Sequence, residues 1–471
     1  MAVVFLLIAA TVIVLVGLAH WYLWRRLVRD VARPGSVWRR TGTFLAFVLP
    51  VLVVTNVVVG RSEAPFALQQ MLAWPGYLWL ALLLYLLMAL AVGEAVRPLL
   101  RRVLERRAAA AGASGTERGA ASQVPSGEDR GARDESPDSA AAVMVTGATD
   151  AEAADGRGAA RPATPPQPGG PGSAGGPGSA RRPGSTGGPG SAGGPQATSR
   201  RLFVARTVAA GATLAAAGTV GAGAWNLLDG PTLKRVTVPL AKLPRSAHGY
   251  RIAVVSDIHL GTVLGRSHAE RIVRTINGAQ PDLVAIVGDL VDGTVEDLGP
   301  AAAPLRQLRS RHGSFFVTGN HEYFGDARAW VDHLRELDVH PLENARVELP
   351  GFDLAGVNDV RGEDSGEGPD FEKALGDRDT ARASVLLAHQ PVQIHESVEY
   401  GVDLQLSGHT HGGQIFPFHL AAALANPTVA GLERYGDTQL YVTRGAGAWG
   451  PPVRVGADPD VTLVQLASKS A

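Results

Sequence analysis

The stretch RIAVVSDIHLG at residues 251–261 decides the fold of the second half of the chain. Its apolar run, 252–255, is short and continuous, which is typical of a strand buried on both faces, and the polar Asp257 and His259 follow it directly. The same plan returns in LVAIVGDLVD at 283–292. Such runs alternate with amphipathic segments along the chain, and this alternation predicts a layered α/β domain.

Working outward from this stretch, we predict five strands and three helices in the domain. The strands are expected at 252–255, 283–287, 315–317, 385–387 and 404–406. The helices are expected at 267–278, 301–311 and 326–338, the last with Trp330, Leu334 and Leu337 on one face.

Each expected strand is followed by side chains that can bind metals or move protons. They are Asp257, His259, Asp289, Asn320, His321, His389, His409 and His411. Loops at the carboxyl ends of strands converge on the ligand site in α/β sheets, so we expect these groups to meet. Gly288, Gly319 and Gly408 lie beside them, where a backbone without Cβ can turn tightly and approach closely.

Five motifs in this region resemble those of the calcineurin-like metallophosphoesterases. In order they are DIH (257–259), GDLVD (288–292), GNHE (319–322), the single His389, and GHTH (408–411). The resemblance covers roughly residues 249–467, about half the chain. It implies a β-sandwich flanked by helices. The longer forms SDIHLG and GHTHGGQIFP look most like the bacterial membrane-associated subgroup, some members of which act on lipid-linked phosphoesters.

The resemblance also implies two divalent metal ions and names their ligands. The first would be held by Asp257, His259, Asp289 and His411, and the second by Asp289, Asn320, His389 and His409. A carboxylate shared by two ions keeps them close, and a water between them would be acidified to hydroxide, the attacking nucleophile. Nitrogen and oxygen donors without thiolate leave Mn, Fe, Zn, Co and Ni open.

His321, Asp292 and Glu322 are implied to act beside the metal ligands. In the family, the residue matching His321 stabilises the transition state and protonates the leaving oxygen. Asp292 and Glu322 are candidates for orienting ligand imidazoles or a loop, although a salt bridge or a helix cap explains them equally well.

Other polar residues receive the simpler interpretation. Asp359 is expected to be a turn aspartate, with the site lining as the alternative, and Arg444 and Arg454 are expected on the surface rather than on phosphate. The remaining histidines lack a motif and are expected at a span end, on the surface or in packing; they are His20, His248, His268, His312, His333, His340, His395 and His419.

The N-terminal region, 1–107, has the composition of a membrane protein. Residues 2–24, 41–60 and 72–93 carry no charged side chain and are long enough to cross a bilayer as helices, the second with Pro50 as a possible kink. Arginines crowd the loop after the first stretch and the segment after the third. The positive-inside rule therefore places both in the cytoplasm and the N-terminus outside.

Two further segments precede the α/β domain, which we place at 230–471. Residues 108–201 are poor in aromatic residues and contain the repeated unit GGPGSA, so we predict a disordered linker. Within 202–229, residues 207–228 are uncharged and follow the pair Arg200–Arg201, which fits either a fourth membrane helix or a twin-arginine export signal. Either alternative places the α/β domain outside the cytoplasm.

Charge and cysteine content narrow the function. The 44 basic and 44 acidic residues balance, which gives no electrostatic argument for a nucleic-acid partner, and without cysteine the chain has no thiolate metal site. The sequence predicts a multi-pass, membrane-anchored phosphoesterase acting on phosphomonoesters, phosphodiesters or pyrophosphates, with lipid-linked or envelope substrates in view. The alternatives are a nuclease or cyclic-nucleotide phosphodiesterase of the same superfamily, and a non-catalytic membrane scaffold.

Overall fold

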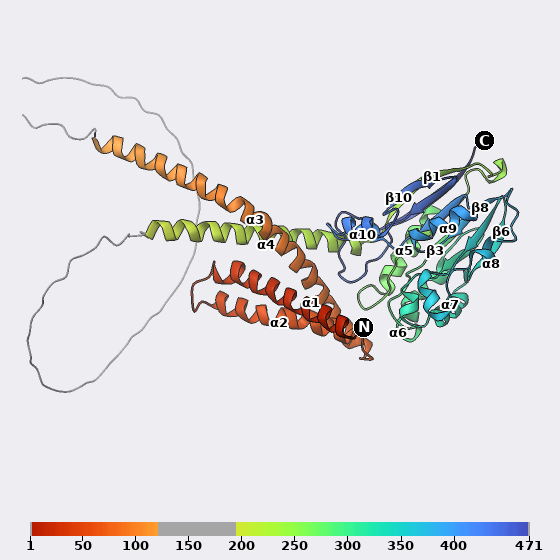
Figure 1. The fold of residues 1–471 in the computed structure, drawn as a ribbon, viewed down its shortest axis with the longest axis horizontal. Helices are drawn as coiled ribbons and strands as arrows, with labels where there is room; N and C mark the ends of the chain where they lie inside the picture. Colours follow the sequence, from red (N-terminus) through yellow and green to blue (C-terminus); the bar gives the residue numbers. More distant parts are fainter. Residues whose placement is uncertain (1, 121–194, 470–471) are drawn as a thin grey trace, which may run out of the picture. The chain divides into compact units, whose positions relative to one another are not determined.

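The structure, a computed structural model, describes residues 2–120 and 195–469. Four long helices contain the apolar stretches: α1 (Ala2–Leu23), α2 (Val37–Val59), α3 (Phe66–Ala120) and α4 (Pro195–Asp229) (Figure 1). Each contains a segment long and apolar enough to cross a membrane. A π-helical turn, Trp24–Arg29, continues α1 into the basic loop, and Pro50 lies inside α2.

The predicted linker is described only at its two ends. Helix α3 continues through residues 108–120 and α4 begins at Pro195, so both helices extend into the predicted range 108–201. The rest of the linker, 121–194, including the GGPGSA repeats, lies outside the described residues.

Two six-stranded mixed sheets form the predicted layered domain. The first has the order β1 (Thr232–Leu240), β12 (Asp460–Ser468), β2 (Arg251–Val255), β3 (Leu283–Val287), β4 (Ser314–Val317) and β5 (Val339–Pro341). The second has the order β10 (Gly431–Tyr435), β11 (Thr438–Val442), β9 (Leu404–Ser407), β8 (Ala383–Leu387), β7 (Phe352–Gly356) and β6 (Ala345–Leu349). All five predicted strands are present, and they run parallel within the β2–β3–β4 and β8–β9 neighbours.

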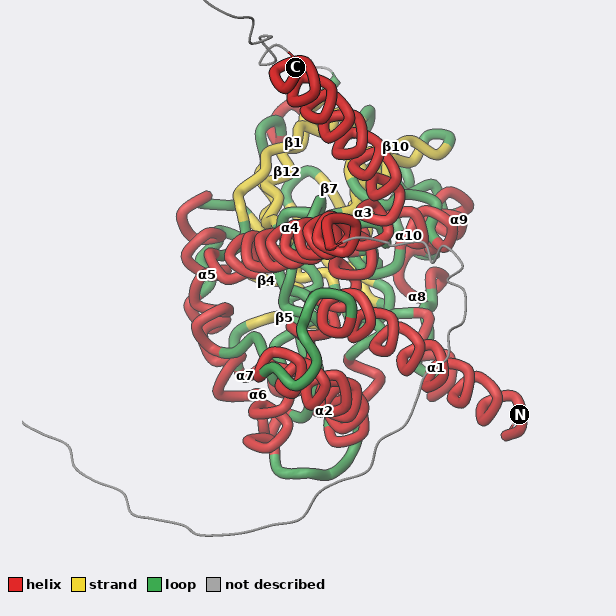
Figure 2. Tube along the Cα trace, turned by 90° about the vertical axis from the view of Figure 1, so that its left-hand side faces the viewer, coloured by secondary structure: helices red, strands yellow, loops and turns green. Residues whose placement is uncertain are grey.

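The sheets pack face to face, and helices cover their outer faces. Alternate residues of both sheets, such as Val254, Val287 and Leu406, share one buried apolar cluster. Figure 2 shows α5 (Arg266–Ala279) on one flank and α8 (Phe371–Leu375) and α9 (Ile394–Glu399) on the other, with the strands between them. The described domain also contains α6 (Val295–Ala302), α7 (Ala327–Glu336) and α10 (His419–Ala425).

Two of the three predicted helices are present, and the third was misplaced. Helices α5 and α7 match their predictions, and Trp330, Leu334 and Leu337 are all buried. The helix predicted at 301–311 instead forms α6, which ends at Ala302, and a 3-10 turn over Ala303–Gln307. Pro304 has no N–H to donate to the carbonyl of residue 300, so the α-helical ladder stops there.

The topology brings both sets of strand ends together. Strands β2, β3 and β4 are neighbours in the first sheet, while β8 and β9 are neighbours in the second. The loops after these five strands carry all eight polar residues predicted from the sequence.

One buried histidine of the fold makes a prediction about stability. His268 on α5 is 1% exposed, and burial, with Arg271 nearby, lowers its pKa to about 3. Below pH ~6.5, His268 binds a proton in the unfolded chain but stays neutral in the folded chain. The free energy of unfolding therefore falls as the pH drops from about 6.5 towards 3. Between about pH 7.5 and 5.5, the full chain should lose about 1–2 kcal/mol more unfolding free energy than His268→Leu. Denaturant unfolding in detergent at both pH values measures this, and parallel losses in both proteins would contradict it.

Candidate metal centre

The structure brings the predicted site residues together at one edge of the sandwich. Three overlapping groups have ligand atoms within 4.8 Å of one another. They are Asp257 with His259 and His411, His259 with Asp289 and His321, and Asp289 with His389 and His409. Within the described ranges, the histidines that lack a motif belong to none of these groups.

The carboxylate of Asp289 lies at the middle of this cluster. Its Oδ2 is 3.2 Å from Nε2 of His389, 3.7 Å from Nε2 of His259 and 4.0 Å from Nε2 of His321. The residue is 2% exposed. Burial alone would raise the pKa of Asp289, but the surrounding imidazoles, His389 above all, hold that pKa well below its ordinary value. Asp289 is therefore an anion that several groups share.

Asp292 orients two imidazoles through a single oxygen. Its Oδ1 lies 2.8 Å from Nδ1 of His259 and 2.7 Å from Nδ1 of His321. Burial opposes ionisation of this carboxyl, yet His259 and His321 lower its pKa to about 2. Because both Nδ1 atoms are bonded to Asp292, the Nε2 atoms are the ring atoms left to meet a metal ion or to carry a proton.

Glu322 braces the loops instead of offering a ligand atom. Its carboxylate accepts backbone N–H bonds from Gly319 (2.6 Å), Leu290 (2.8 Å) and Asp289 (3.1 Å). Burial, reinforced by the nearby Asp289, raises the pKa of Glu322 to about 7. This side chain fastens the loop after β3 to the loop after β4.

The backbone of the site adopts unusual conformations. Asp257, His259, Asp289, His409 and His411 all have positive φ, between 49° and 73°. Side chains rarely occupy this region, and such strain gathers at functional sites. Close approach adds a second demand: a Cβ on Gly319 would lie 2.3 Å from Oδ1 of Asp289, and one on Gly408 would lie 1.9 Å from Oγ of Ser256.

Buried atoms without partners test whether a metal ion fits here. Oδ1 of Asn320 and Nε2 of His389 are buried and form no hydrogen bond. Nε2 of His259 and Nε2 of His411 face each other at 3.0 Å. Nε2 of His389 lies 3.2 Å from Oδ2 of Asp289, and Nε2 of His411 lies 3.3 Å from Oδ1 of Asp257. Imidazole, amide and carboxylate groups gathered in this way suit Mn, Fe, Zn, Co or Ni. The residues can therefore hold metal.

Outside the motifs, the prediction for Asp359 agrees with the structure and the prediction for Arg454 does not. Asp359 caps the turn that follows it by accepting the N–H of Arg361 (2.8 Å), as expected of a turn aspartate. Arg454 was expected on the surface, but it is 1% exposed. Its guanidinium donates to the carbonyls of His411 (2.8 Å) and Gly447 (2.7 Å) and lies 3.2 Å from Nδ1 of His411. The sequence does not predict the burial of Arg454, because its partners are backbone carbonyls that only the fold brings together.

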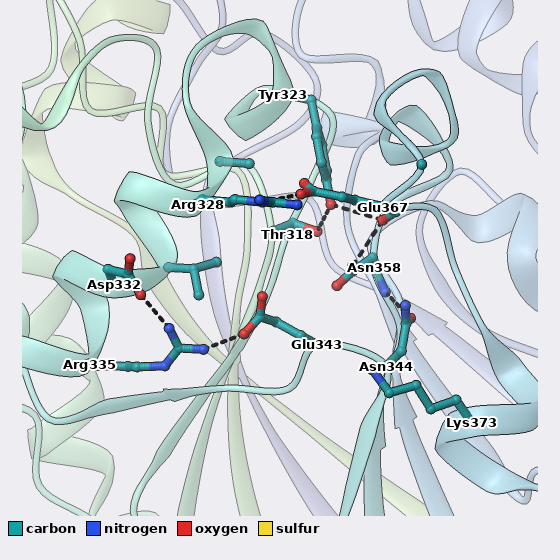
Figure 3. Close-up of a pocket in the computed structure, with 13 residues that line it drawn as sticks. Thr318, Tyr323, Arg328, Asp332, Arg335, Glu343, Asn344, Asn358, Glu367 and Lys373 are labelled. Carbon is teal, nitrogen blue, oxygen red and sulfur yellow. Dashed lines mark hydrogen bonds and ion pairs between the residues drawn. The ribbon is translucent and has the colours of Figure 1, made fainter.

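A separate polar cavity of about 400 Å³ is lined by none of the metal-ligand candidates (Figure 3). It lies beside the loop after β4, with Thr318 and Tyr323 in its wall. Its two arginines are already paired: Arg328 with Glu367, and Arg335 with Asp332 and Glu343. This pairing leaves neither arginine free for an anion, so the metal cluster remains the candidate site.

Comparison with known proteins gives one family. The family model described as Calcineurin-like phosphoesterase matches residues 250–413. A "Transmembrane protein with metallophosphoesterase domain" of Bos taurus is 41% identical over 261 residues, which are 52% of this chain and 59% of that protein. An "Uncharacterized metallophosphoesterase" of Aquifex aeolicus is 34% identical over 52% of this chain and 97% of its own length. One of Helicobacter pylori is 39% identical over 53% of this chain and 67% of its own length. The relatives are both bacterial and eukaryotic, so the expected restriction to a bacterial subgroup is too narrow.

The central position of Asp289 predicts what its loss does to metal binding. Asp289→Asn should lower the metal content of the purified full chain, after loading with Mn²⁺ and dialysis, to less than about half of the wild-type value, since the shared charge is removed. Asp353→Asn is the matched control, because Asp353, on β7, is also buried but pairs with Arg382. The control should keep its metal. Full metal occupancy in Asp289→Asn, measured by atomic emission, would contradict the assignment.

Proposed function

This chain belongs to the calcineurin-like metallophosphoesterases, and from that premise we propose that it is a membrane-anchored phosphoester hydrolase that uses two divalent metal ions. One observation carries the proposal: Oδ2 of the buried Asp289 lies among the Nε2 atoms of three histidines from different loops. The chain covers 59% of the bovine relative, so the activity is proposed here for this chain in its own right.

The candidate ligands divide into two sets that share Asp289. Asp257, His259 and His411 complete the first set, and Asn320, His389 and His409 complete the second. When bound, the ions supply Lewis acidity that lowers the pKa of a water and offsets charge on the phosphoryl oxygens. Asp292 and Glu322 then have the supporting roles that their hydrogen bonds indicate, one on the imidazoles and the other on the loops.

His321 is proposed as the proton donor to the leaving oxygen. Its Nδ1 is held by Asp292 at 2.7 Å, and its side chain keeps 10% exposure at the surface of the cluster. An imidazole fixed at Nδ1 presents Nε2 for proton transfer, and Asp292 stabilises the imidazolium that donates.

The four apolar helices support a multi-pass membrane protein. Arginines predicted on the cytoplasmic side lie at one end of the helices: Arg26 pairs with Glu94 (3.1 Å), Glu94 with Arg97 (3.0 Å), and Arg206 donates to the carbonyl of Val31 (3.2 Å). This arrangement supports the predicted orientation, with the metallophosphoesterase domain outside the cytoplasm. In that orientation α4 ends at the domain, which favours substrates at the bilayer surface, including lipid-linked phosphoesters.

An activity screen tests the proposed reaction directly. The full chain in detergent, loaded in turn with Mn²⁺, Zn²⁺ or Co²⁺, should hydrolyse p-nitrophenyl phosphate, its diester or a lipid pyrophosphate, and lose that activity with EDTA. Asp289→Asn provides the inactive control. If none of these bonds is hydrolysed with any metal, the proposed function is wrong.

His321 should matter most for substrates with poor leaving groups. His321→Ala should slow an alkyl phosphate by about 10²–10⁴-fold, because a basic alkoxide needs a proton to depart, while p-nitrophenyl phosphate loses far less. Asp292→Asn should show a weaker version of the same selectivity. Turnover of both substrates and metal per chain are the measurements. Equal losses on both substrates would show that His321 positions the phosphate instead.

Retention of α4 as an anchor is the last element of the proposal. Leu227 is fully buried against Leu264 and Ala448 of the domain, and Gly223 accepts the N–H of Arg454 at 3.0 Å. Processing after Ala224, as an export signal would require, would remove Gly223 from this contact.

Substitution of the arginine pair distinguishes a membrane anchor from a twin-arginine export signal. Replacing Arg200 and Arg201 with Lys keeps the charge, so a membrane anchor should still place the protein in the membrane fraction at wild-type level. Twin-arginine export reads the guanidinium pair and would fail. Blotting of membrane and medium fractions decides, and a soluble fragment beginning at Trp225 would contradict retention.

A further inference from the structure

Two exposed aromatic side chains lie against the ring of His321. The ring centroid of Phe324 is 4.8 Å from that of His321, and the centroid of Trp449 is 5.7 Å away, both approaching edge to face. Phe324 is 63% exposed and Trp449 is 60% exposed. Large apolar side chains left in water beside a reactive group typically mark a binding surface, and the proposed chemistry uses neither of them.

The loops that hold the candidate metal ligands also fix these two rings. Gln414, three residues after His411, accepts the backbone N–H of Trp449 and donates to its carbonyl, both at 3.0 Å. The guanidinium of Arg361 lies 5.8 Å from the centroid of the Phe324 ring. The pair, which we term the aromatic rim, is therefore built into the site.

The position of the rim indicates which part of a substrate it meets. His321 is the proposed donor to the leaving oxygen, so groups that flank its ring face the leaving group. The residue before Trp449, Ala448, packs on Leu227 of α4. The rim consequently adjoins the end of the helix that is proposed to cross the bilayer, where an apolar chain can reach the site without crossing open water.

We propose that Phe324 and Trp449 bind the acyl or isoprenoid chain of a lipid phosphoester on its leaving-group side, and so determine substrate specificity. This inference rests on the proposed phosphoesterase function and adds the residues that recognise the substrate. Covering about 50 Å² of apolar surface per ring corresponds to roughly a ten-fold gain in kcat/KM.

A matched pair of substrates tests the rim. Glycerol 3-phosphate and its dihexanoyl ester share the same leaving oxygen and differ only in the acyl chains. The full chain in lipid nanodiscs should prefer the acylated ester by about a hundred-fold in kcat/KM, about ten-fold from each ring. Trp449→Ala and Phe324→Ala should each reduce this preference about ten-fold, chiefly through KM, whereas Trp449→Phe should keep most of it. Val398→Ala, an exposed apolar side chain on α9, is the control and should leave activity and preference unchanged.

The outcomes separate the rim from the reaction. Absence of a preference in the wild type, or a preference that survives both alanine variants, overturns the inference even when hydrolysis is efficient. A rim-dependent preference for a nucleoside monophosphate over the acylated ester would also overturn it, in favour of base stacking. If no substrate is hydrolysed, calorimetric binding of octylphosphonate against methylphosphonate still decides: about ten-fold tighter binding of the octyl compound, lost in Trp449→Ala, supports the rim, while equal affinities overturn it.

Discussion

The buried charge of Asp289 is the interaction on which the rest of the site depends. An anion that is 2% exposed is costly to bury unless positive charge or hydrogen bonds surround it. Three imidazoles surround its Oδ2 atom, those of His259, His321 and His389. The backbone N–H of His321 donates to its Oδ1 atom at 2.9 Å. The three imidazoles come from three different strand ends. The strands of both sheets must therefore end at the same edge of the sandwich, and this requirement constrains the topology of the fold.

Holding the loops in place requires strain and its compensation. Five ligand candidates have positive φ. The backbone N–H of His409 donates to the carboxylate of Asp257 at 3.1 Å, and the Glu322 carboxylate accepts four backbone N–H groups. A left-handed residue persists only where such contacts over-determine it. The same bracing gives the site rigidity before any ion binds, which is the property that a metal centre needs to fix its ligand geometry.

Sequence reasoning succeeded where local pattern and topology agree. Strand β3 was predicted at 283–287 and found there, because an unbroken apolar run ending at Gly288 permits little else. It failed at 301–311, where Pro304 ends the α-helix within a segment that has helical periodicity. It also missed the burial of Arg454 and the contact of Trp449 with His321. Both depend on segments far apart in the chain, which periodicity does not report.

Arg454, which was predicted wrongly to lie on the surface, connects α4 to the site. Its backbone N–H donates to the carbonyl of Gly223 on α4, and its side chain donates to the carbonyl of His411. A charged group that is fully buried needs nearly all of its donors satisfied, so its place is set by both partners together. Burial lowers the pKa of Arg454 to about 10, which still leaves it a cation at neutral pH. The end of α4 thus helps to hold Arg454, whose side chain contacts a candidate metal ligand, and separating the domain from α4 would disturb that contact.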